Sequence, residues 1–97
     1  MKYTIKYSNG AESDLDKVFD YIAADNLPRA VTFIAEIEAV VQNLLLFPLM
    51  GRQLDEKPQQ RRLIYGNYKI IYEIKESKKE IRIMHVKNCA QSEKKYL

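Results

Sequence analysis

The sequence predicts an α+β fold with the order β-α-α-β-β-β, in which an antiparallel sheet carries a two-helix hairpin on one face. Three observations predict this class. Alternating apolar and polar residues begin the chain and recur in its second half, two intervening stretches have apolar residues at helical spacing, and a two-residue Gly-Asn joins two later strands. The 97 residues suit one domain, residues 1–97, whose modest core leaves little room for a deep cavity. We therefore expect a surface site.

The first strand and both helices occupy the first half of the chain. Residues 2–7 alternate, as in a half-buried strand, and Ser8 or the residue after it is the expected helix N-cap. The first helix has four apolar residues at i, i+3, i+4 and i+7: Leu15, Val18, Phe19 and Ile22. A break at residues 25–27 precedes Pro28, which suits the first turn of a second helix with an apolar stripe. The short connection predicts an antiparallel helix pair.

Three strands occupy the second half. Residues 52–60 are polar and are expected to form an exposed loop. The runs 61–65 and 68–74 follow, joined by Gly-Asn, and glycine accepts the positive φ that a tight hairpin turn requires. A charged turn leads to the last strand, residues 80–86. The three strands are predicted to form an antiparallel meander.

One face of this sheet packs on the helices and the other is open, and alternation decides what lies on each. In the third strand four residues share a face: Tyr68, Ile70, Tyr72 and Ile74. In the last strand the pattern groups Ile81, Ile83 and His85 against Arg82, Met84 and Val86. Both faces are mixed, so the pattern does not tell which is open. A basic and aromatic open face suits a nucleic acid; a solvated hairpin with strand-forming tyrosines and edge lysines explains the same residues.

Composition sets limits on partners and compartment. The net charge of +3 and pI of about 9.0 permit an acidic partner without demanding one. A single cysteine fits a reducing compartment, and no apolar run approaches the length of a membrane span. We expect a cytoplasmic protein that does not enter a membrane. One His and one Cys give no metal site, and no cofactor is expected.

Any chemistry would then be metal-free acid–base chemistry. RNA can be cleaved this way, when a base takes the 2′-OH proton and cations stabilise the charge on phosphorus. The available groups are His85, Glu56, three tyrosines (Tyr65, Tyr68, Tyr72) and the arginines. His85 also has an ordinary structural interpretation, and both interpretations stay open.

An ordered set of residues resembles the RelE/ParE superfamily of toxins from bacterial type II toxin–antitoxin, or plasmid stabilisation, systems. The set is Ala11, Asp14-Leu15, Tyr21-Ile22, Ala30, Phe33-Ile34, Ile37, Leu44, Phe47-Pro48, Gly51-Arg52, Arg61 or Arg62, and the YKIIY run at 68–72. It spans nearly the whole chain. The resemblance implies the same fold and a cognate antitoxin whose C-terminal segment wraps the toxin, with a homodimer or a heterotetramer with antitoxin as the assembly.

The resemblance implies two mechanisms, because ParE-like members poison DNA gyrase whereas RelE-like members cleave mRNA on the ribosome. Many members end the last strand with a His or Asp followed shortly by Arg, whereas this chain has Asn88 and Ala90 in those places, and the missing arginine disfavours RelE-like cleavage. Gln91 and Lys95 still fit a tail of this kind. We therefore expect a ParE-like toxin, with a ribosome-dependent endoribonuclease and a degenerate member that only binds antitoxin as alternatives.

Two sets of candidate residues follow. If the chain is a nuclease, the catalytic candidates are His85, Glu56 and Arg62. The candidates for binding target or antitoxin are Arg52, Arg61, Arg62, Tyr65, Tyr68, Lys69, Tyr72 and Lys87.

Overall fold

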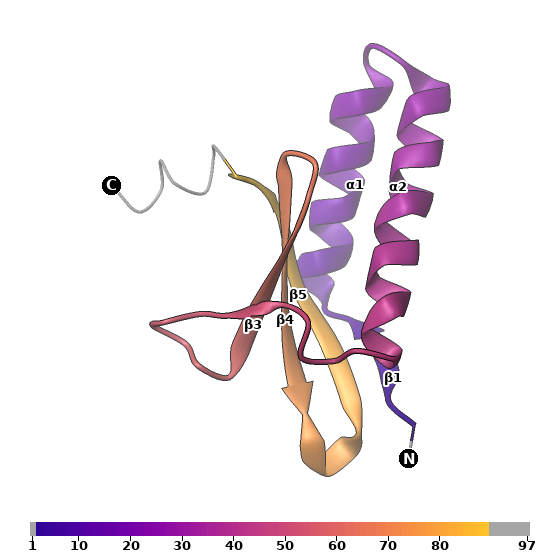
Figure 1. Cartoon of the computed structure of the whole chain (residues 1–97). Coiled ribbons are helices and arrows are strands. Elements are labelled where there is room, and N and C mark those ends of the chain that lie inside the picture. The colour runs from indigo at the N-terminus through magenta and orange to yellow at the C-terminus, as the bar shows by residue number, and fades with distance from the viewer. Residues whose placement is uncertain (1, 90–97) are drawn as a thin grey trace.

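The computed structural model describes residues 2–89 and shows a twisted sheet with two antiparallel helices on one face (Figure 1). The elements in chain order are β1 (Thr4–Tyr7), α1 (Asn9–Ala23), α2 (Leu27–Gln42), the 3₁₀ turn η1 (Asn43–Leu45), β2 (Arg52–Gln53), β3 (Gln60–Tyr65), β4 (Tyr68–Lys75), the 3₁₀ turn η2 (Glu76–Lys78) and β5 (Glu80–Asn88). The predicted α+β class and element order are confirmed. No helix within residues 2–89 is long and apolar enough to cross a bilayer.

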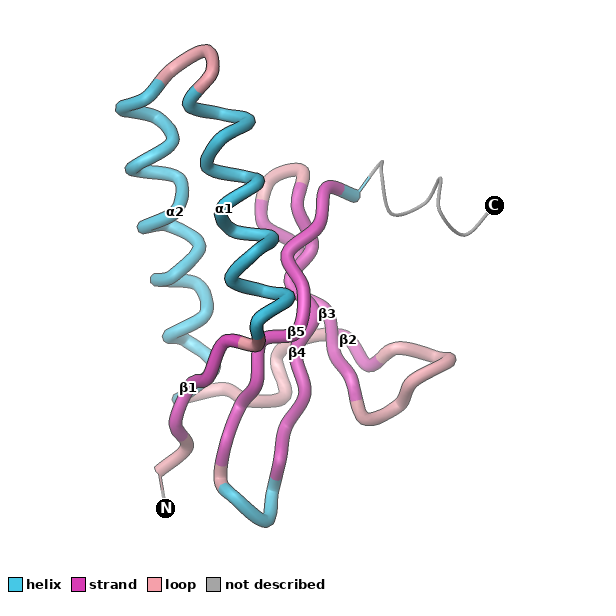
Figure 2. Tube along the Cα trace, turned by 180° about the vertical axis from the view of Figure 1, so that it is seen from behind, coloured by secondary structure: helices cyan, strands magenta, loops and turns pink. Residues whose placement is uncertain are grey.

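The sheet has the order β1-β5-β4-β3-β2, with β3, β4 and β5 in the predicted antiparallel meander. Two features were not predicted. β1 lies parallel to β5, which makes the sheet mixed, and the long connection through both helices permits this pairing. β2 adds two residues to the edge of β3, inside the stretch expected to be a loop (Figure 2).

Local signals in the sequence explain the ends of the elements. The Ser8 hydroxyl caps α1 by accepting a hydrogen bond from the Ala11 N–H at 3.0 Å. The Asn26 side-chain oxygen caps α2 by accepting a hydrogen bond from the Arg29 backbone N–H at 3.0 Å. The β3–β4 hairpin turns at Gly66, whose φ of +59° is the conformation that glycine adopts without strain.

The core lies between the helix pair and one face of the sheet. The sheet contributes five fully or nearly fully buried side chains: Ile70, Tyr72, Ile81, Ile83 and Val86. The helices contribute Val18, Phe33, Ile37 and Val41. This identifies the face that alternation left undecided: the tyrosine–isoleucine face of β4 packs inward.

A β-bulge in β5 changes which face of the sheet its last residues occupy, so part of the prediction for this strand was wrong. The register shifts between Ile71 and Tyr72, so that Tyr72 lies opposite Ile83 but Ile71 lies opposite His85. The extra residue reverses the alternation beyond it. The grouping of His85 with the core residues of β5 was therefore wrong: Val86 takes the core position and His85 lies on the open face.

Candidate functional site

The open face of the sheet has two halves that differ in charge. At the half nearer the β3–β4 hairpin, cations lie directly opposite cations: Arg52 faces Arg62, and Lys69 faces Lys87. His85 lies in the same row as these arginines, with Ile71 between Arg62 and His85. We call Arg52, Arg62, Lys69, His85 and Lys87 the basic end.

At the other half, opposite charges meet. Glu73 faces Arg82, and Lys75 faces Glu80. Ion pairs join Lys75 to Glu73 at 2.9 Å and Arg82 to Glu80 at 2.7 Å. Hydrogen bonds from Gln60 and then Lys75 hold the pKa of the Glu73 carboxyl below its usual value. We call these four charged residues the paired end.

Asp14 of α1 contacts two residues of the basic end, Lys87 and His85. Its side chain is buried and accepts a hydrogen bond from the Val86 N–H at 3.0 Å. β1 pairs with β5 only up to Ile83, so Asp14 provides an acceptor for a backbone N–H of β5 that β1 does not pair. The second oxygen pairs with Lys87 Nζ at 3.0 Å, and His85 Nδ1 lies 3.5 Å from the first. The sequence pointed to Asp14 as an acidic residue near the start of a helix and as part of a family pattern, but not to this role, because the contact joins residues 72 positions apart.

Arg61 and Tyr72, two predicted binding residues, lie on the helix face and hold the segment before β2. Tyr72 Oη donates to the Pro48 carbonyl at 2.7 Å and accepts from the Gly51 N–H at 2.9 Å. Arg61 Nη1 donates to the carbonyls of Gly51 at 2.7 Å and Leu49 at 3.3 Å. Tyr72 is fully buried, and burial raises the pKa of its hydroxyl. In this conformation Tyr72 has no surface to offer a partner.

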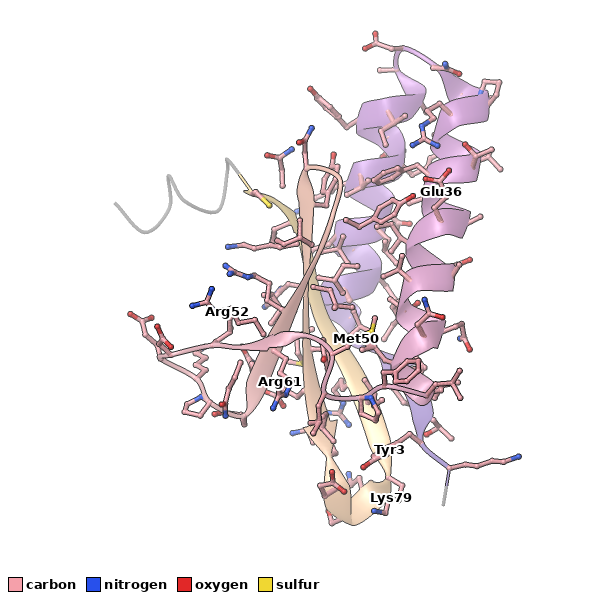
Figure 3. The ribbon with its side chains drawn as sticks, in the orientation of Figure 1. Tyr3, Glu36, Met50, Arg52, Arg61 and Lys79 are labelled. Atoms are coloured by element: carbon pink, nitrogen blue, oxygen red, sulfur yellow. The ribbon has the colours of Figure 1, made fainter. Side chains whose placement is uncertain are left out.

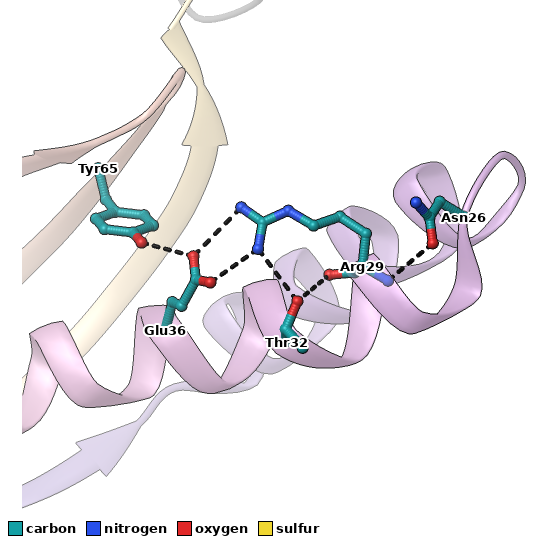
Figure 4. Close-up of polar contacts among 5 residues, drawn as sticks. All are labelled: Asn26, Arg29, Thr32, Glu36 and Tyr65. Atoms are coloured by element: carbon teal, nitrogen blue, oxygen red, sulfur yellow. Dashed lines mark hydrogen bonds and ion pairs between the residues drawn. The ribbon is translucent and has the colours of Figure 1, made fainter.

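Tyr65 and Tyr68 also turn towards the helices. Both rings pack on Phe33, and the Tyr65 hydroxyl donates to Glu36 at 2.6 Å (Figure 4). Arg29 pairs with the same carboxylate at 2.8 Å. Hydrogen bonds from Arg29 and then Tyr65 lower the pKa of Glu36, and the bond to Glu36 raises the pKa of Tyr65. This network ties β3 to α2.

The remaining candidates are spread out. Glu56 lies exposed in the loop between β2 and β3, whereas His85 lies on β5 with two strands between. Asn88 ends β5 and lines a shallow groove of about 380 Å³, together with Asp14, Lys17, Tyr21, Tyr68 and Lys87. Ala90, Gln91 and Lys95 lie outside the described residues.

The predicted set therefore divides. The structure brings together Arg52, Arg62, Lys69, His85 and Lys87 on the open face, and places the tyrosines and Arg61 on the other. Such a surface can bind phosphates or carboxylates. Within residues 2–89, no three His, Cys, Asp or Glu side chains gather as a metal site would require.

One family model matches most of the chain. Residues 5–93 match the family model described as the ParE toxin of the type II toxin–antitoxin system parDE. No curated protein sequence matches the chain significantly.

Solved structures share the fold. The chromosomal ParDE system of P. aeruginosa matches with a TM-score of 0.73 and 22% identity over 89% of this chain and 95% of the other. The RelBE2 toxin–antitoxin complex of Mycobacterium tuberculosis gives 0.66 and 24% over 91% and 99%. The isolated E. coli RelE toxin gives 0.69 and 13% over 98% and 99%.

Proposed function

Because the chain belongs to the ParE toxin family of type II toxin–antitoxin systems, we propose that it arrests bacterial growth by binding DNA gyrase and that a cognate antitoxin neutralises it. The observation that carries this proposal is the ParE match over residues 5–93, which runs from β1 through β5. The activity is binding, so the chain needs no catalytic group. It acts in the cytoplasm, and in its genetic context it stabilises the plasmid or chromosomal segment that encodes it.

The positive charge of the basic end favours an acidic segment of the antitoxin as the partner that binds there and neutralises the toxin. Arg62 and Lys87 lie on open strand surface, and Arg52 is exposed on the edge strand. A disordered acidic segment can fold along such a surface and cover it. A heterotetramer of two toxins and two antitoxins is the expected assembly, with a toxin homodimer as the alternative.

A second candidate, an endoribonuclease acting on ribosome-bound mRNA, has one specific observation in its favour. The His85 imidazole lies 3.5 Å from the Asp14 carboxylate, as in a base held by an acid, and Arg62 lies on the same open face. Their Cα atoms are two strand spacings apart, about 10 Å, within which both side chains can reach one phosphate. Glu56 would be the alternative base.

Induced expression without antitoxin separates these candidates. We expect growth to stop, DNA damage signalling to rise and mRNA to stay intact, and we expect His85→Ala to remain toxic. Cleaved mRNA, lost with His85→Ala or Arg62→Ala but not with Lys75→Ala, would instead establish the nuclease. Full growth of cells that accumulate the folded protein would identify a degenerate member that only binds antitoxin.

A further inference from the structure

The segment between η1 and β2 exposes four large apolar side chains within five residues. Leu46, Phe47, Leu49 and Met50 are 75%, 62%, 65% and 43% exposed. We call these four residues the apolar segment. The other large apolar side chains that are exposed within residues 2–89 are spread over three elements: Tyr21, Leu27, Val31 and Ile64. Isolated exposed apolar residues are ordinary, but a contiguous group of them marks an interaction surface.

The backbone of this segment is fixed from beneath. The buried Tyr72 hydroxyl and the Arg61 guanidinium together bind the carbonyls of residues 48, 49 and 51 and the N–H of Gly51. A Cβ at Gly51 would lie 2.6 Å from Tyr72 Oη, so this close approach needs glycine. The Met50 N–H donates to the Phe47 carbonyl at 3.1 Å, which adds an internal turn.

This arrangement reverses that of an ordinary surface loop. Loops usually leave their polar backbone to water and turn apolar side chains inward. Here buried groups satisfy the backbone, and the apolar side chains point outward. A segment held in this way loses little conformational entropy on binding, so its apolar side chains are preorganised for a partner.

The chemistry of the segment identifies the kind of partner. Apolar side chains gain nothing from phosphates, so the partner is a protein with an apolar pocket. Arg61 lies beside the segment on the same side of the sheet (Figure 3), and its positive charge favours an acidic rim. A second copy of this chain across a twofold axis would bring Arg61 towards its own equivalent, which disfavours self-association.

We propose that the apolar segment is the surface by which this toxin docks on its protein target, inserting Leu46 and Leu49, its two most exposed side chains, into an apolar pocket with an acidic rim. The proposal rests on the proposed function, since it presumes a target protein. It adds the location of the contact, on the helix side of the sheet and away from the basic end.

A pair of double variants tests the location. Leu46→Ser with Leu49→Ser removes two anchors from the segment, and Leu27→Ser with Val31→Ser removes two equally apolar, exposed side chains from α2. Both proteins are checked for native circular dichroism and thermal unfolding. We expect the first pair to raise the concentration that half-inhibits DNA supercoiling by purified gyrase about 100-fold, as the loss of two interface anchors does, and to abolish growth arrest. The α2 pair should act like the wild type.

Each other outcome overturns the proposal. If the wild type is inert towards growth and gyrase, the proposed function fails and the inference fails with it. If the wild type is toxic and the segment variant is equally toxic, only the inference fails. A variant that stays toxic but escapes the antitoxin assigns the segment to the antitoxin, and a wild-type dimer that the variant loses assigns it to a second copy. Equal loss in the α2 pair removes the segment's special role.

Discussion

The two ends of the open sheet face use the same residue types in opposite arrangements. At the paired end, Lys75 lies opposite Glu80 and Arg82 lies opposite Glu73. Each cation forms its ion pair with the carboxylate two residues away on its own strand, Lys75 with Glu73 and Arg82 with Glu80. At the basic end, Arg52 lies opposite Arg62, and Lys69 lies opposite Lys87, which also pairs with Asp14. Like charges directly opposite across a sheet reduce stability, whereas opposite charges add to it.

This difference distinguishes charged residues that stabilise the fold from charged residues that bind a partner. In a solvated hairpin, like charges directly opposite each other reduce stability, and a neutral polar residue in the same place would not. Residues that reduce stability in the absence of a partner are those that a binding surface retains for its partner. The comparison therefore favours the basic end over the paired end as the place where a polyanion or an acidic protein segment binds.

The largest effect on stability should come from substituting Asp14, a buried carboxylate that pairs with Lys87 of the basic end. Asp14→Ala leaves the buried Val86 N–H without an acceptor and Lys87 without its counter-charge. We expect a loss of about 2 kcal/mol in the free energy of unfolding, or roughly 10 °C in the midpoint of thermal unfolding. Asp16→Ala, at an exposed position of the same helix, controls for helix propensity. An equal effect of the two substitutions would contradict the role assigned to Asp14.

The fold was predictable because local signals agreed with one another. The Gly-Asn turn, the helical stripes and the Ser8 cap each specify an element from adjacent residues, and all are found where expected. The parallel pairing of β1 and the two-residue β2 were not predictable, because strand pairing between distant segments leaves no local pattern.

The candidate site was predictable only in part. Residue types identified the basic side chains, but a bulge in β5 reversed the face of His85, and bulges carry no reliable sequence mark. Period-two alternation placed Arg61 and Arg62 on opposite faces without showing which was open. The like-charged pairs depend on register, which only the assembled sheet fixes.

An intermediate effect is expected at the paired end in acid. The folded pKa of Glu73 is depressed, chiefly by its hydrogen bond from Gln60, so the unfolded chain binds a proton more readily than the folded one. Its stabilisation is therefore complete above the ordinary carboxyl pKa of about 4.3 and is lost as pH falls through the lower folded value. Glu73→Gln should flatten the fall in the free energy of unfolding between pH 5 and pH 3.

Urea denaturation at several pH values measures this slope. Glu56→Gln, at an exposed position of the loop between β2 and β3, is the control for removing a carboxylate outside the paired end. If Glu73→Gln leaves the acid slope unchanged, the paired end does not contribute through this carboxylate, and half of the comparison fails.

The smallest expected effect on stability gives the sharpest test, because removing an arginine should change the free energy of unfolding in opposite directions at the two ends. Arg82→Gln removes a cation from opposite-charge contacts with Glu73 and Glu80, and should lower the free energy of unfolding by about 0.5 kcal/mol. Arg62→Gln relieves repulsion from Arg52 and should raise it by a few tenths of a kcal/mol. Glutamine keeps much of each side-chain stem, so packing changes little.

Arg62→Gln should also weaken antitoxin binding, measured by calorimetry, whereas Arg82→Gln should not. A stability loss at Arg62 equal to that at Arg82 would mean that the two ends are electrostatically alike, and the like-charged pairs would then no longer indicate a binding surface.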